Sequence, residues 1–123
     1  MGIDPGSRKT GFAVIEMVGN KFHYVDSGVL KFDKIENFLD RLPSAYLEAE
    51  ELLKKYNPDE VALESLIFVK SPTALIKLAQ TRGAIIAAFG IVLTDKVFEY
   101  APNLLKPLFQ GMDIQRKKEW LRR

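Results

Sequence analysis

Residues 2–11 of the chain read GIDPGSRKTG, and this stretch decides how the rest is arranged. Gly2 and Ile3 suit the end of a short strand, which Pro5-Gly6 breaks directly after Asp4. Asp4 therefore lies at a strand tip beside a tight turn, where little backbone separates its carboxylate from solvent. Strand tips are the places where α/β sheets meet ligands and metals.

Two further strands are expected after this turn. Residues 11–16 are apolar and partly β-branched, and residues 22–30 are rich in aromatic and β-branched side chains. The turn residues between them, with Gly19-Asn20 at the centre, predict a β-hairpin. Together with the first strand, they predict three sequential antiparallel strands.

A helix and a fourth strand are expected next. Apolar residues recur at steps of three and four over residues 35–56, which predicts a helix with one apolar face. Pro43 inside this pattern predicts a kink or a helix start nearby. Asn57-Pro58-Asp59 ends the helix. Residues 60–64, EVALE, then form a short strand that ends in Glu64.

The last part of the chain repeats this alternation. Ser71-Pro72 is a good N-cap and first-turn pair for a long helix that runs to about Phe89. Residues 96–100 form another short strand, and residues 101–103 begin a further helical stretch. The expected order is βββαβαβα, an α/β fold with a mixed central sheet flanked by helices.

Composition narrows the function classes. A chain of 123 residues makes a single domain, and zero cysteines exclude disulfides and cysteine-based zinc sites, so a reduced cytoplasm is expected. We see no secretory signal and no apolar run long enough to cross a bilayer; the most apolar stretch is residues 84–94. The net charge of +2 is small, but residues 114–123 hold five basic residues against Glu119. Such a stripe suits phosphates as well as a solvated helix face.

Two acids stand where chemistry is expected. Asp4 ends the first strand, and Glu64 ends a strand with an apolar frame, where an acid is costly to bury without compensation. If the two strands are neighbours, the carboxylates face each other. Paired carboxylates without histidine or cysteine suit magnesium or manganese, which can promote phosphodiester cleavage. The alternative is that Asp4 is a turn former and Glu64 a surface acid.

A phosphate-binding loop is a competing interpretation of the first motif. Residues 4–10, DPGSRKT, resemble the first phosphate loop of actin-like ATPases. Those enzymes clamp nucleotide between two lobes, whereas this chain is long enough for one. No glycine directly precedes Lys9, so the Walker pattern is not met either.

Three segments, in order, make the chain similar to the RuvC family of Holliday-junction resolvases. They are residues 2–7 with Thr10-Gly11; residues 62–70 continuing as 74–83, ALIKLAQTRG; and residues 99–102 with Leu105-Lys106 and Gly111. The resemblance implies an RNase H-like fold and a magnesium-dependent endonuclease. It also implies a homodimer that cuts two opposed strands of a four-way DNA junction symmetrically in recombination and repair. A branch-migration helicase complex is a candidate further partner.

The resemblance assigns roles to particular residues. Asp4 and Glu64 fall on the family's first two metal-binding acids and are therefore the expected catalytic residues. One family position is a loop aromatic that contacts the junction core, and this chain offers isoleucine and then phenylalanine there; other positions are basic residues that meet the DNA backbone. The implied DNA contacts are Ile67, Phe68, Lys106 and Lys117. The helix from Ser71 onward resembles a dimer-interface helix, whose apolar face here comprises Leu75, Leu78 and Ala79.

The chain departs from the family at both ends. The first strand lacks the residues that usually precede Gly2, and the family's last two metal-binding acids have no counterpart before Arg123, because Asp113 precedes the basic stretch rather than following it. We therefore expect a fragment, a shortened form or a decayed copy, with weak magnesium binding and slow or absent cleavage. Two other hypotheses stay open: a catalytically inactive DNA-binding or dimerisation module, and a general RNase H-like nuclease acting on RNA or hybrid duplexes.

Overall fold

The computed structural model describes residues 1–65 and 71–100. Its elements follow the predicted order as far as the fifth strand, and the helical stretch expected from residue 101 lies outside the described residues. The elements are β1 (Gly2–Asp4), β2 (Lys9–Val18), β3 (Lys21–Lys31), α1 (Phe38–Tyr56), β4 (Val61–Glu64), α2 (Pro72–Val92) and β5 (Val97–Tyr100).

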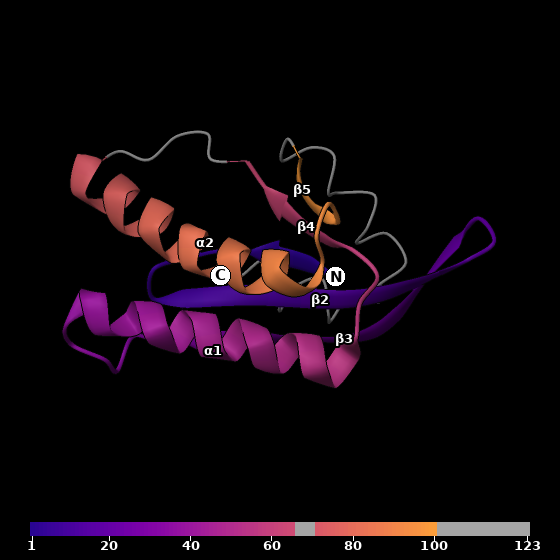
Figure 1. Ribbon diagram of the computed structural model, residues 1–123, viewed down its shortest axis with the longest axis horizontal. Coiled ribbons are helices and arrows are strands. Elements are labelled where there is room, and N and C mark those ends of the chain that lie inside the picture. Colours follow the sequence, from indigo (N-terminus) through magenta and orange to yellow (C-terminus); the bar gives the residue numbers. More distant parts are fainter. Residues whose placement is uncertain (66–70, 101–123) are drawn as a thin grey trace.

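The five strands form one mixed sheet in the order β3-β2-β1-β4-β5 (Figure 1). β1, β2 and β3 pair antiparallel, as predicted, and the hairpin between β2 and β3 turns at Gly19, whose φ of 61° favours glycine. β4 pairs parallel to β1 and β5 pairs parallel to β4. The chain therefore returns to β1 after α1, which makes β1 the centre of the sheet.

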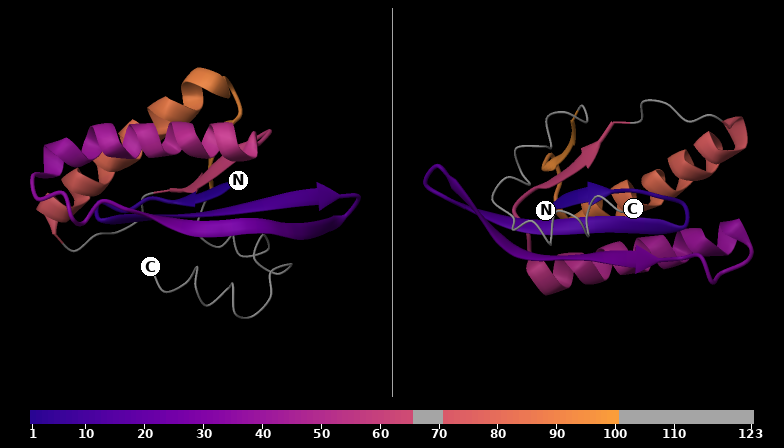
Figure 2. Two further views of the ribbon diagram at one scale, coloured as in Figure 1. Left: turned by 90° about the horizontal axis from the view of Figure 1, so that it is seen from below. Right: turned by 180° about the vertical axis from the view of Figure 1, so that it is seen from behind.

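Both helices cover the same face of the sheet (Figure 2). α1 begins after Asn37, whose side-chain oxygen accepts a hydrogen bond from the amide of Leu39 at 3.2 Å. The helix runs through Pro43 rather than starting there, and it ends at Asn57, as predicted. Its buried residues lie at steps of three and four, on one side of the helix: Ala45, Ala49, Leu52 and Leu53.

The second helix also starts at its predicted N-cap. The Ser71 hydroxyl accepts a hydrogen bond from the amide of Ala74 at 3.3 Å, and α2 continues to Val92, beyond the predicted end. Among the described residues, α2 alone is long and apolar enough to cross a membrane, judged by length and composition. The expectation of no such run is wrong, because the helix that holds most of the apolar residues 84–94 begins already at Pro72. Ile85 and Phe89 bury this helix against the sheet and α1.

The core lies between the sheet and the two helices. Ile3 of β1 and Leu63 of β4 are both fully buried in it. Because side chains alternate between the faces of a strand, Asp4 and Glu64 lie on the face turned away from the helices. The other core residues include Phe12, Val14, Phe32, Ala45, Ala49, Val61, Ile85, Ala88 and Phe89.

Candidate metal centre

The tip of β1 ends in a turn with its own internal hydrogen bonds. The Gly6 amide donates to the Thr10 hydroxyl oxygen at 3.3 Å, and that hydroxyl donates to the Gly6 carbonyl at 3.2 Å. A Cβ at Gly6 would lie 2.2 Å from the Lys9 carbonyl oxygen, so only glycine fits there. Pro5 and this turn fix the point at which the chain leaves β1, directly after Asp4.

The tip of β4 lies beside that of β1. The two strands pair in parallel with Gly2 opposite Ala62 and Ile3 opposite Leu63. The next residues in the same register are Asp4 and Glu64, which share one face and one end of the sheet. The structure therefore brings the two acids together, as the sequence suggested for neighbouring strands. Their role as metal ligands stays a prediction.

The electrostatics of Glu64 agree with this placement. Burial raises the pKa of the Glu64 carboxyl above its usual value, and the negative charge of Asp4 raises it further. Two carboxylates that repel each other in a partly desolvated place favour a proton or a cation between them. A divalent cation with oxygen ligands fits this donor set.

A buried arginine lies behind the acids. Arg82 of α2 is 7% exposed, and its Nη2 donates to the main-chain carbonyl oxygen of Glu64 at 3.0 Å. The same nitrogen lies 3.2 Å from Oε2 of Glu99 on β5. Sequence reasoning gave Arg82 no role beyond the family motif. The available signal was an arginine directly before the apolar second half of the helix.

The rest of the expected site is not assembled in the described part of the chain. Residues 1–65 and 71–100 contain no group of three or more histidine, cysteine, aspartate or glutamate side chains that could hold a metal. The expected DNA contacts lie outside the described residues: Ile67, Phe68, Lys106 and Lys117. The expected dimer contacts lie in the first half of α2, where Leu75 and Ala79 are exposed and Leu78 is half-buried.

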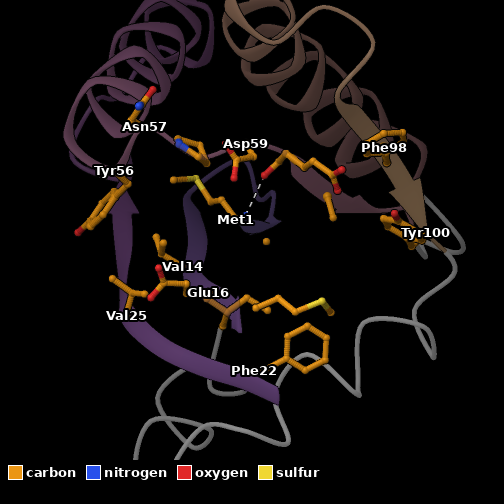
Figure 3. Close-up of a pocket in the computed structure, with 16 residues that line it drawn as sticks. Met1, Val14, Glu16, Phe22, Val25, Tyr56, Asn57, Asp59, Phe98 and Tyr100 are labelled. Atoms are coloured by element: carbon orange, nitrogen blue, oxygen red, sulfur yellow. Dashed lines mark hydrogen bonds between the residues drawn. The ribbon is translucent and has the colours of Figure 1, made fainter. Parts of the chain in front are cut away.

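A pocket of about 840 Å³ lies away from the two acids (Figure 3). Met1 and Gly2 line it, together with Ala62, but neither Asp4 nor Glu64 does. Glu60 and Asp59, which precede β4, also line it, and its lining extends along β5 to Tyr100, the residue that pairs with Glu64. Its walls also include Val14, Glu16, Phe22, Val25, Tyr56, Asn57 and Phe98.

The fold resembles those of solved resolvases. A Thermus thermophilus RuvC structure superposes with a TM-score of 0.72 at 26% sequence identity, covering 89% of this chain and 68% of that one. T. thermophilus RuvC in complex with a Holliday junction substrate gives a TM-score of 0.73 at 24% identity, again covering 89% and 68%. The predicted α/β, RNase H-like sheet is therefore confirmed as far as β5.

Sequence comparison gives closer relatives. The crossover junction endodeoxyribonuclease RuvC of Histophilus somni is 39% identical over 120 residues, which are 97% of this chain and 62% of that protein. The protein of the same name from Geotalea uraniireducens is 40% identical over 111 residues, 90% of this chain and 64% of that protein. The chain thus spans less than two thirds of the length of these two relatives. The model of the family described as crossover junction endodeoxyribonuclease RuvC matches residues 1–120, and the chain belongs to that family.

Proposed function

We propose that this chain carries part of a magnesium-dependent endonuclease that binds four-way DNA junctions and nicks them symmetrically. The observation that supports this most is the pairing of Asp4 with Glu64 at adjacent strand tips, on the sheet face turned away from α1 and α2. Relatives named crossover junction endodeoxyribonuclease, and a related resolvase solved with a Holliday junction, indicate the DNA substrate.

Asp4 and Glu64 would hold Mg²⁺, or Mn²⁺ in its place. A bound divalent ion lowers the pKa of a water molecule and polarises a phosphate oxygen. The two carboxylates belong to adjacent strand tips, and the turn after Asp4 takes the chain out of the sheet directly beside them. Because burial raises the pKa of Glu64, this carboxyl must lose a proton before it can bind a cation, so metal affinity should fall at low pH.

A homodimer would present two such sites to opposed strands of one junction. Exposed apolar side chains in the first half of α2, Leu75 and Ala79 with the half-buried Leu78, support this face as the dimer interface. Ile67, Phe68, Lys106 and Lys117 remain the proposed DNA contacts, and the proposed setting is the cytoplasm. A branch-migration helicase complex is a further proposed partner.

Replacing Asp4 tests the proposal directly. The wild-type chain should bind a synthetic four-way junction and nick it slowly, only when Mg²⁺ is present. Asp4→Asn should reduce nicking at least about 100-fold, because it removes a charged ligand, and should change junction affinity less than about twofold. Gel shift and denaturing gels measure the two quantities. Asp59→Asn, the same change at an exposed acid after α1, should leave both at wild-type values.

A catalytically inactive DNA-binding or dimerisation module is the second candidate. It is favoured by the absence of a third acid beside Asp4 and Glu64 in the described residues. Junction binding by the wild-type chain without nicks at any Mg²⁺ concentration would support the module. Nicks that survive in Asp4→Asn would show that other residues hold the metal. Competition with RNA and hybrid duplexes separates junction resolution from a general RNase H-like nuclease.

A further inference from the structure

Arg82 is a charged residue in a buried position, where its desolvation is unfavourable. The neighbouring buried residues on α2 include Ile85, Ala88 and Phe89, and a guanidinium among them costs free energy unless its N–H groups find partners. Its Nη2 has two partners, the Glu64 carbonyl and the Glu99 carboxylate. Its Nε is buried and has no hydrogen-bond partner in the part of the chain that the structure describes.

The strand ladder explains why the Glu64 carbonyl needs a donor. In β4 the even-numbered residues direct their main-chain groups toward β1, as the bond from the Ala62 amide to the Met1 carbonyl at 2.9 Å shows. The odd-numbered residues face β5, and the Ser65 amide donates to the Tyr100 carbonyl at 2.7 Å. Continued by two residues, the same ladder directs the Glu64 carbonyl toward the main-chain nitrogen of residue 5.

Residue 5 is a proline and has no N–H to donate. The ladder between β1 and β4 therefore ends with an acceptor that the neighbouring strand cannot satisfy. The Nη2 of Arg82 takes the place of the missing amide, at 3.0 Å. The proline that ends β1 beside Asp4 thus leaves the Glu64 carbonyl for Arg82 to bind.

We infer that Arg82 is a positioning residue that fixes the last peptide of β4 and so keeps the Glu64 carboxylate beside Asp4. This inference rests on the proposed metal-binding role of the two acids. Arg82 acts through the backbone of Glu64 and is not itself a ligand. Glu99, whose side chain is 56% exposed, holds the guanidinium from the β5 side.

Arg82→Met separates positioning from packing. Met keeps an apolar side chain of similar length, and the Glu99 carboxylate that loses its ion pair is 56% exposed to solvent, so a purely structural role predicts a folded variant with normal metal binding. Positioning predicts that Mn²⁺ binding weakens by roughly 10- to 100-fold, as for other residues that orient metal ligands. The measurement is the EPR signal of free Mn²⁺ titrated with the intact chain, without DNA. Arg82→Lys, which keeps a cationic donor, should recover part of the affinity.

Two controls keep the outcomes distinct. Thr81→Val alters the fully buried neighbour of Arg82, which donates to the Lys77 carbonyl, and should leave Mn²⁺ affinity unchanged. Glu99→Gln removes only the exposed carboxylate that pairs with Arg82, and it should weaken Mn²⁺ binding, as Arg82→Met does. It therefore replaces Arg82→Met if that variant does not fold.

The results separate the two proposals. If a folded Arg82→Met chain binds Mn²⁺ as tightly as the wild type, the positioning role of Arg82 is overturned. The same holds for Glu99→Gln where it replaces Arg82→Met. The proposed metal site then still stands, provided that Asp4→Asn abolishes Mn²⁺ binding. If the wild-type chain binds no Mn²⁺, or Asp4→Asn binds as well as wild type, both proposals are overturned.

Discussion

The Glu64 carboxyl is both partly buried and close to a second negative charge. Its strand neighbour Leu63 is fully buried, yet the Glu64 carboxyl lies next to a second acid at the ends of two central strands. Burial and the charge of Asp4 both favour its protonated form. The pair therefore costs stability whenever both groups are ionised without a cation between them, a cost typical of functional sites.

Glu64→Gln should reveal this cost as a pH dependence of stability. The folded-state pKa of Glu64 is raised, so its contribution to stability is present below the unfolded-state pKa and is lost as the pH rises through the folded-state pKa. Without metal, the wild-type chain should therefore lose stability across that acidic range relative to Glu64→Gln. Urea unfolding at a series of pH values measures the difference.

Magnesium provides the matching check on Glu64. Added Mg²⁺ should stabilise the wild-type chain at neutral pH, because it binds the folded state, and should not stabilise Glu64→Gln. Equal Mg²⁺ stabilisation of both chains would exclude Glu64 as a ligand. Parallel pH profiles of the two chains without metal would contradict the raised pKa.

The turn between β1 and β2 shows how an element can depend on one small residue. Thr10 is fully buried and its hydroxyl bonds both the amide and the carbonyl of Gly6. The Phe32 amide donates to the Arg8 carbonyl at 2.8 Å, and this bond ties the turn to the end of β3. The exit from β1 is thus held from two sides.

Gly6→Ala should destabilise this element by about 1–3 kcal/mol, because the new Cβ would lie 2.2 Å from the Lys9 carbonyl and the backbone would have to move. Gly90→Ala is the matched control, since a Cβ at this helical position in α2 meets nothing within 4 Å. That change should instead stabilise the chain by about 0.5–1 kcal/mol. Urea midpoints measure both, and a stabilising effect of Gly6→Ala would refute the steric argument.

At the scale of the whole molecule, the two helices share one face of the sheet and the first half of α2 extends past the core (Figure 2). The buried residues of α2 lie in its second half, from Thr81 onward. Leu75 is 40% exposed and Ile76 58% exposed. An exposed apolar helix surface of this kind supports the proposed homodimer.

Leu75→Asp should convert the proposed dimer to a monomer. Burying a leucine contributes about 1.5–3 kcal/mol, so a charge at this position should weaken association at least about tenfold. Sedimentation velocity over a concentration series measures the change. Leu47→Asp is the control, because Leu47 on α1 is 59% exposed and lies outside the proposed interface. A monomeric wild-type chain, or equal loss of dimer in both variants, would count against this interface.

Local sequence signals were sufficient for most elements. The Gly19-Asn20 turn, the Ser71-Pro72 helix start and the Asn57 helix end each depend on the conformational preferences of a few adjacent residues, and all three are confirmed. The start of α1 was less certain because Pro43 suggested a later beginning. The Asn37 cap sets it instead.

Only part of the candidate site could be predicted from the sequence. Asp4 and Glu64 were identified as strand-tip acids, because Pro5-Gly6 and an apolar frame mark them locally. Their adjacency depends on β1 pairing in parallel with β4, a contact between segments far apart in the chain that packing on the helices decides. The role of Arg82 depends further on the register, since the alignment of Glu64 with Asp4 directs the Glu64 carbonyl toward Pro5, which has no N–H, and leaves it for Arg82 to bind. The conformational preferences of neighbouring residues thus determined the helices, strands and turns. The burial of apolar faces between segments far apart in the chain determined which strand ends lie side by side.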